Sequence, residues 1–121
     1  MADYLPKHLP GTAVTFTASA DVIGGRLVAI TGPQAVGPAG ADSAAVVGVA
    51  GFDAKAGEPV TVYTRAGGVQ RLTASGAIAA AAKVSSAAAG KIQTVGSTEN
   101  PIGLALQAAA ADGDVIDVLF I

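Results

Sequence analysis

The residues that could carry acid–base or nucleophilic chemistry are few in this chain and lie far apart. The only histidine is His8, which stands between Pro6 and Pro10 in a segment with no predicted element to hold its ring. The adjacent hydroxyls of Ser85 and Ser86 have no base at a fixed distance in the sequence. We therefore expect His8 to be a surface residue or a partner contact, and we expect the protein not to be an enzyme.

Carboxylates form one cluster, Asp112, Asp114 and Asp117, whose spacing superficially suggests an oxygen-ligand site for calcium. In a strand, however, Asp114 and Asp117 point to opposite faces, and the segment lacks the acidic density and central glycine of a calcium loop. The pattern favours Asp112 and Asp114 as turn residues and Asp117 as a solvent or interface residue. Without cysteine the chain has no disulfide and no thiolate metal site. We expect no metal and no cofactor.

One lysine carries an alternative interpretation. The segment Asp53-Ala54-Lys55-Ala56 lies between strand signals and resembles the lysine hairpin of lipoyl and biotinyl carrier domains, which would imply an acyl or carboxyl group on Lys55. The residue before the lysine differs from that pattern, and the segment is also an ordinary turn. The carrier domain is kept as a distant alternative.

Length and composition favour one thinly packed domain. The chain has 121 residues, which matches single cores of about 100 to 150 residues. Half of the residues are apolar, but there are only three Phe, two Tyr and no Trp, so a monomer buries little area per side chain. Burial between subunits would offset this. The net charge of −2 without a basic run argues against nucleic acid, and no apolar stretch approaches the roughly 20 residues of a membrane span. We expect a soluble protein with no small-molecule substrate.

A short phrase, glycine followed by a charge and then alternating apolar residues, recurs at Gly25, Gly57 and Gly113. Val47-Gly48-Val49-Ala50 and Ile102-Gly103-Leu104-Ala105 precede the second and third copies. Roughly half of the chain therefore repeats the other half. Alternation and turn residues predict strands at Thr12–Ala18, Arg26–Thr31, Gln34–Val36, Ala44–Ala50, Val60–Arg65, Val69–Thr73, Lys91–Val95, Ile102–Leu106 and Val115–Ile121, with a hairpin turn at Ala66-Gly67-Gly68 and a polar turn from Gly96 to Pro101.

Two segments are less simple. Ser75 to Ala89 is rich in alanine, which favours helix, yet it lies between strand signals. We expect a single helical turn or loop and then a short strand. Alternatively, Ala81, Val84 and Ser86 belong to a degraded fourth copy of the phrase, with Lys83–Ser86 extended. The last strand is apolar on both faces, interrupted only by Asp117, and must be covered twice, by a closed barrel or by another subunit.

Taken together, these patterns predict an all-β or β-rich fold with one short helical segment. The fold class is a small single-domain β-barrel or sandwich with an internal pseudo-repeat, formed by residues 12–121. Residues 1–11 form an extended N-terminal arm, since two prolines hold their neighbours extended and Tyr4, Leu5 and Leu9 are unusually apolar for a solvated tail.

Specific segments also carry a family resemblance. The run from Ala44 to Ala50 followed by Val60 to Val69 resembles the head decoration proteins of tailed bacteriophages, including the lambda type. The second half, with Ala82–Ile92, Ile102-Gly103-Leu104-Ala105 and Asp112-Gly113-Asp114-Val115, is similar to the capsid cement proteins of actinobacterial and other phages. The likeness covers most of residues 12–121.

This resemblance implies a structural virion protein that binds the outer surface of the expanded icosahedral capsid as a trimer. It would stabilise the shell against the pressure of packaged DNA, with the major capsid protein as its partner, after assembly in the host cytoplasm. Family members often attach through an N-terminal arm that adds to a strand of the capsid protein. The alternative is another β-structured head or tail accessory protein. By position, the arm residues are Asp3, Tyr4, Leu5, Pro6, Lys7, His8, Leu9 and Pro10.

Overall fold

Strands make up nearly all of the regular structure. The computed structural model describes residues 12–65, 68–96 and 100–121. The predicted arm at residues 1–11, two residues of the predicted hairpin turn (66 and 67) and residues 97–99 of the polar turn lie outside this part. The elements are β1 (Ala13–Ala18), β2 (Leu27–Gly32), β3 (Ala35–Pro38), β4 (Val46–Ala50), β5 (Pro59–Thr64), β6 (Val69–Thr73), β7 (Lys83–Ser86), the 3-10 helix η1 (Ala88–Gly90), β8 (Ile92–Thr94), β9 (Gly103–Ala105) and β10 (Val115–Phe120).

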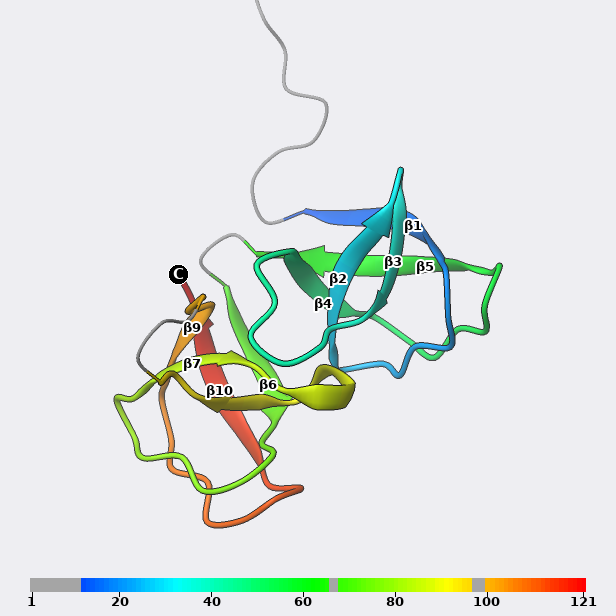
Figure 1. Cartoon of the computed structure of the whole chain (residues 1–121). Helices are drawn as coiled ribbons and strands as arrows, with labels where there is room; N and C mark the ends of the chain where they lie inside the picture. Colours follow the sequence, from blue (N-terminus) through cyan, green and yellow to red (C-terminus); the bar gives the residue numbers. More distant parts are fainter. Residues whose placement is uncertain (1–11, 66–67, 97–99) are drawn as a thin grey trace, which may run out of the picture.

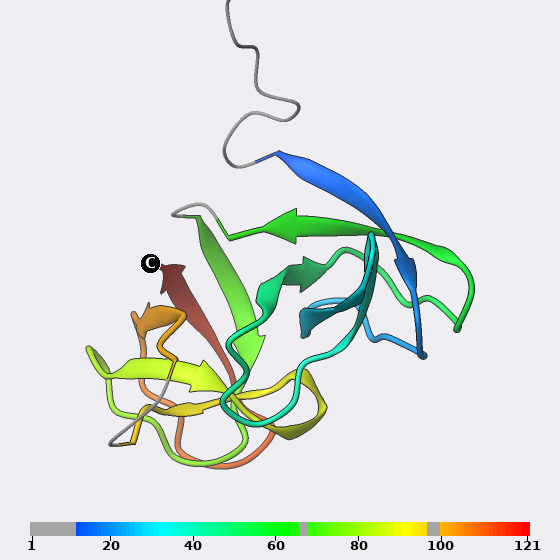
Figure 2. The ribbon, with the colours of Figure 1, turned by 45° about the horizontal axis from the view of Figure 1, so that its top comes forward.

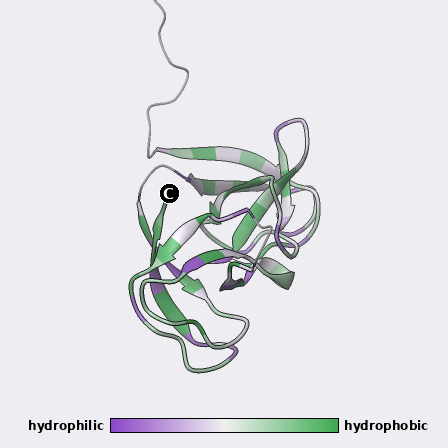
Figure 3. Ribbon diagram, turned by 60° about the vertical axis from the view of Figure 1, so that its left-hand side comes forward, coloured by the Kyte–Doolittle hydropathy of each residue, from purple (hydrophilic) through white to green (hydrophobic). Residues whose placement is uncertain are grey.

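Each predicted strand is present, with ends shifted by at most two residues. The all-β fold class is therefore confirmed. The short 3-10 helix η1 of the described residues follows β7, whereas the sequence analysis expected a helical turn or loop before that strand. Along several strands, more and less hydrophobic residues alternate, as the changing colour of the ribbon in Figure 3 shows. This alternation is what the sequence pattern of period two requires.

The strands form two halves that lie side by side. Residues 12–65 form a closed barrel in the order β1-β3-β2-β4-β5, in which β1 also pairs with β5. Residues 68–121 form a sheet in the order β6-β10-β9-β7-β8. Figure 1 shows the N-terminal barrel in blue to green and the C-terminal sheet in green to red, and the turned view in Figure 2 keeps them apart.

The two halves share one topology. In both, the first strand pairs antiparallel with the last, and the last with the fourth, so that β6, β7, β8, β9 and β10 correspond to β1, β2, β3, β4 and β5. The parallel contact between β1 and β3 has its counterpart in a bridge between Ala74 and Ile92. Even a side-chain bond recurs, since Ser19 Oγ donates to Val36 O and Ser75 Oγ donates to Ile92 O, each at 3.1 Å. The predicted internal repeat is thus a duplicated β-unit.

Buried side chains confirm the duplication position by position. Nine buried apolar residues inside the N-terminal barrel each have a buried apolar counterpart 55 or 56 residues later. The same pattern of apolar residues therefore produces a similar core in each half, and both cores consist largely of Ala, Val and Ile. The nine are Phe16, Ala18, Val22, Val28, Val36, Ala50, Ala54, Val60 and Val62; their counterparts are Leu72, Ala74, Ile78, Val84, Ile92, Ala105, Ala109, Ile116 and Val118.

The alanine-rich stretch contains the fourth copy of the turn. Ala81 has a φ of 71°, matching the positive φ of Gly25, Gly57 and Gly113 at the other three turns. A turn followed by strand β7 is what we expected for this stretch, and its equivalence to the glycine turns supports the alternative of a degraded repeat. Intrinsic helix propensity gives way here to the pairing of β7 with β8 and β9.

Candidate functional site

The aspartates at the C-terminal end serve the scaffold. Asp114 Oδ2 accepts hydrogen bonds from the backbone N–H of Ala110 at 2.8 Å and of Ala111 at 3.2 Å, which fixes the turn before β10. Asp112 pairs with Lys91, with Nζ and Oδ1 2.9 Å apart, and the Asp117 carboxylate lies 4.0 Å from the Arg71 guanidinium. Within residues 12–65, 68–96 and 100–121 there is no group of three His, Cys, Asp or Glu side chains that could hold a metal ion.

Lys55 lies in the turn that leads into β5. Its backbone N–H donates to Glu58 Oε1 at 2.8 Å, and its ammonium is 3.7 Å from the Asp21 carboxylate. Together with Asp53 these charged groups line a surface cavity of about 360 Å³. Because both Lys55 and Asp21 are largely exposed, the ion pair contributes little stability.

Near this cavity two large apolar side chains are exposed at the end of the N-terminal barrel. Ile23 is 51% and Phe52 is 49% exposed. Their counterparts in the C-terminal half are Ala79 and Gln107, so the duplicated scaffold does not require large apolar residues at these two positions. Both are large apolar side chains that the described part of the fold leaves exposed.

Polar contacts fix the two halves relative to each other. Asn100 donates from its backbone N–H to Asp42 Oδ1 at 2.7 Å. Ser86 Oγ donates to Gly40 O at 2.7 Å and accepts from Ser43 N–H at 2.9 Å. A loop of the N-terminal half is therefore bonded to β7 and to the start of the β9 segment. Such a junction lets the two halves act as one rigid body.

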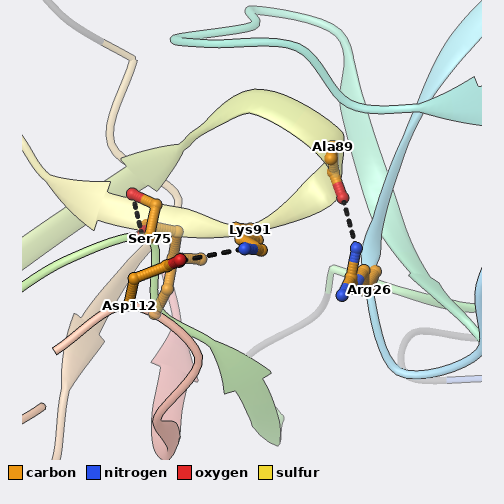
Figure 4. Close-up of polar contacts among 6 residues, drawn as sticks. Arg26, Ser75, Ala89, Lys91 and Asp112 are labelled. Carbon is orange, nitrogen blue, oxygen red and sulfur yellow. Dashed lines mark hydrogen bonds and ion pairs between the residues drawn. The ribbon is translucent and has the colours of Figure 1, made fainter.

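Two arginines extend the junction. Arg26 reaches Ala89 O of η1 at 3.4 Å, as Figure 4 shows beside the Lys91–Asp112 pair. The Arg65 guanidinium donates to Val46 O in its own half and, at 3.5 Å, to Pro101 O and Ile121 O in the other half. This side chain therefore joins the two halves. Burial lowers the pKa of the Arg65 guanidinium from its ordinary value. An arginine nevertheless stays protonated, so these donors persist at neutral pH.

The two adjacent serines of β7 are buried at this junction and do different things. Ser86 is fully bonded, whereas Ser85 is 0% exposed and its Oγ has no hydrogen-bond partner within the described residues. The position equivalent to Ser85 in the N-terminal half is Ala29. Within the described residues, the partners of Ser86 Oγ are backbone atoms, and neither hydroxyl is hydrogen-bonded to a basic side chain.

Replacing Ser85 with Ala is expected to stabilise the protein by about 1 kcal/mol. A buried hydroxyl without a partner loses its hydrogen bonds to water on folding and gains none in the protein. Ser86→Ala is the matched control and is expected to destabilise by about 1 to 3 kcal/mol, since it leaves Gly40 O and Ser43 N–H unpaired. Urea unfolding of both variants measures the difference. Lower stability of Ser85→Ala would mean that its hydroxyl has a partner.

Comparison with known proteins identifies the family. The sequence profile described as phage cement protein matches residues 8–120. The chain belongs to the phage cement protein family. No curated protein matches it. Among solved structures, the head fiber gp8.5 N base of bacteriophage phi29 is similar, with a TM-score of 0.72 and 17% sequence identity over 91% of this chain and 93% of that one. At this identity the likeness shows the shared fold.

Family membership makes this cement protein a structural component of the phage head. The predicted attachment residues, Asp3 to Pro10, lie outside the described part of the chain, so their placement stays a prediction. Sequence reasoning did not single out Ile23 and Phe52. A comparison of the two copies of the repeat could have identified them, since only the first copy has large apolar residues at these two positions. Within the described residues no helix is long and apolar enough to cross a membrane.

Proposed function

We propose that this protein binds the outer surface of the expanded icosahedral capsid as a trimer and stabilises the shell against the pressure of packaged DNA. The observation that carries the proposal is the match of the phage cement family over residues 8–120. The mechanism is adhesion: each trimer bridges neighbouring capsid subunits, and many modest contacts repeated over the shell add up.

The scaffold supports an adhesive role. Two β-halves joined through Asp42, Ser86 and Arg65 present a rigid body that transmits load between its contacts. In the described part of the chain most of the charged groups serve turns, the junction and surface ion pairs. The side chains left over are apolar and exposed, which suits binding to another surface.

The arm is the proposed attachment to the major capsid protein. Residues Asp3, Tyr4, Leu5, Pro6, Lys7, His8, Leu9 and Pro10 would add as an extended segment to an exposed strand of the capsid protein. Backbone hydrogen bonds give affinity in this mode, while Tyr4, Leu5 and Leu9 bury apolar area. The two prolines reduce the entropy lost on ordering the segment.

The test is to add the purified protein to undecorated expanded heads and to image them by electron cryomicroscopy. We expect new density on the outer surface with threefold symmetry, and a higher resistance of decorated heads to disruption by chelator or heat. Heads that stay undecorated at high protein concentration would contradict the proposal.

A second candidate is another β-structured head or tail accessory protein, and the similarity of the fold to a head fiber base favours it over the Lys55 carrier domain. Quantitative mass spectrometry of purified virions distinguishes a cement protein from an accessory protein. A cement protein is expected at an abundance comparable to that of the major capsid protein, and an accessory protein at a much lower one.

A further inference from the structure

The outer face of the C-terminal sheet carries an apolar row that nothing in the described chain covers. Backbone pairing places Lys83 beside Leu104, Leu104 beside Leu119 and Leu119 beside Val69, across strands β7, β9, β10 and β6. Val69 is 53% exposed, and Leu104 and Leu119 are half-buried. Two further exposed apolar residues, Leu106 and Ile121, continue from strands β9 and β10. This face includes the second apolar side of the last strand, β10, which the sequence analysis expected to be covered.

The same row exists in the N-terminal barrel, where half of it is covered. There Leu27 pairs with Val49, Val49 with Tyr63 and Tyr63 with Ala13, in the same register. Leu27 is 0% and Val49 is 4% exposed, because both belong to the apolar cluster that they form with residues of the C-terminal half. In one copy of the repeat this face is therefore an established contact surface for another β-half.

Charge on the C-terminal face argues for a partner that is itself weakly charged. The only oppositely charged groups among the outward residues of β6 and β10 are Arg71 and Asp117, which lie 4.0 Å apart and offset each other. Lys83 stands at the end of the row and is exposed. The whole chain has a net charge of only −2 and few large side chains, so a second copy meets this requirement and gains burial from it.

We propose that the outer face of β6, β10 and β9, centred on Val69, Leu104 and Leu119, is the contact with a second copy of this chain. The proposal rests on the trimer of the proposed function and assigns its interface. Within one chain, the contact between the halves already covers the Leu27 and Val49 part of this face in the first copy of the repeat. A neighbouring subunit covers the corresponding face of the second copy, and three subunits close the ring.

The absence of cysteine from the chain allows a direct test in solution. Val69→Cys places one thiol in the face, and Phe52→Cys places one at a site of similar exposure, 49%, on the N-terminal barrel. In the assembled protein we expect the thiol at position 69 to react with a maleimide much more slowly than the thiol at position 52. After unfolding in urea the two should react alike.

A second measurement removes the contact. Val69→Asp is expected to convert a species of three times the 11.6 kDa chain mass into one of 11.6 kDa in light scattering, with an unchanged circular dichroism spectrum, because this side chain is largely exposed in the single chain. Phe52→Asp is the matched control and should keep the larger mass. Leu119→Asp should act as Val69→Asp does.

Each contrary result is informative. A trimer that persists in Val69→Asp, with a reactive thiol in Val69→Cys, overturns the assigned face and leaves the proposed function intact. A thiol that is reactive in solution and protected only on expanded heads also overturns it, because the shell would then be the occupant. A wild-type protein that is monomeric at all concentrations would refute both the proposed subunit contact and the trimer. Binding to expanded heads is a separate measurement and tests the proposed function.

Discussion

Deletion of residues 2–11 is expected to abolish binding to expanded heads while leaving a folded protein. The buried cores of both halves consist of residues from Phe16 onward, and within the described residues strand pairing begins at Ala13. The truncated chain therefore keeps every apolar cluster described for the fold. Its melting temperature should stay within a few degrees of that of the full chain.

The expected loss of affinity is large because strand addition depends on the backbone of the arm. Five added hydrogen bonds of about 1 kcal/mol each correspond to several thousand-fold in the dissociation constant. Co-sedimentation with undecorated expanded heads measures this loss. Full-strength binding by the truncated protein would refute the attachment role of the arm.

Two variants separate the contributions within the arm. Replacing Tyr4, Leu5 and Leu9 together with Ala keeps the backbone and removes the apolar contacts, so binding should weaken but remain measurable. Lys7→Ala is the control for simple charge attraction. If Lys7→Ala alone removed binding in a salt-dependent way, electrostatic attraction would replace strand addition as the explanation.

Local patterns were sufficient to predict the strands. Alternation from Thr12 to Ala18 and from Val115 to Ile121 gave the first and last strands because side chains in a strand alternate with period two. The glycine-plus-charge phrase marked the turns at Gly57 and Gly113, where a positive φ favours glycine. The same signal was weaker at Ala81, since alanine there suggests helix and only the pairing of β7 makes the segment extended.

Contacts between the two halves could not be predicted from the sequence. The bonds of Asn100 to Asp42 and of Arg65 to Pro101 join residues that are far apart in the chain and carry no local motif. The burial of Leu27 and the partial exposure of Leu104 likewise depend on which face the other half covers. The proposed attachment residues rest on position and composition, because an extended arm gains its structure from a partner.

The repeat also contains a pair of glycines whose replacement by Ala is expected to have a large effect on stability. Gly48 in β4 and Gly103 in β9 occupy equivalent positions, and each lies where a neighbouring strand passes closely. A Cβ at Gly48 would fall onto the carbonyl oxygen of Tyr63 and lie 2.9 Å from Thr64 Cα. These obstacles are backbone atoms, which move only if the barrel itself deforms.

We therefore expect Gly48→Ala to lower the free energy of unfolding by about 3 kcal/mol or more, with a fall in melting temperature of roughly 10 °C. At Gly103 a Cβ would meet Val118 Cγ1 at 2.6 Å and Leu119 O at 2.7 Å. Because part of this clash is with a side chain, Gly103→Ala should cost slightly less. Chemical and thermal unfolding followed by circular dichroism measures both.

Gly40→Ala and Gly76→Ala are the matched controls, one in each half. Neither site has any atom within 4 Å of the added Cβ, and neither has a positive φ. At such sites alanine restricts the unfolded chain, so stability should stay unchanged or rise by about 0.5 kcal/mol. If Gly48→Ala were as stable as these controls, the close approach of β4 and β5 would be absent in solution. The closed barrel would then need a different register at Gly48, since its pairing with Thr64 depends on that approach.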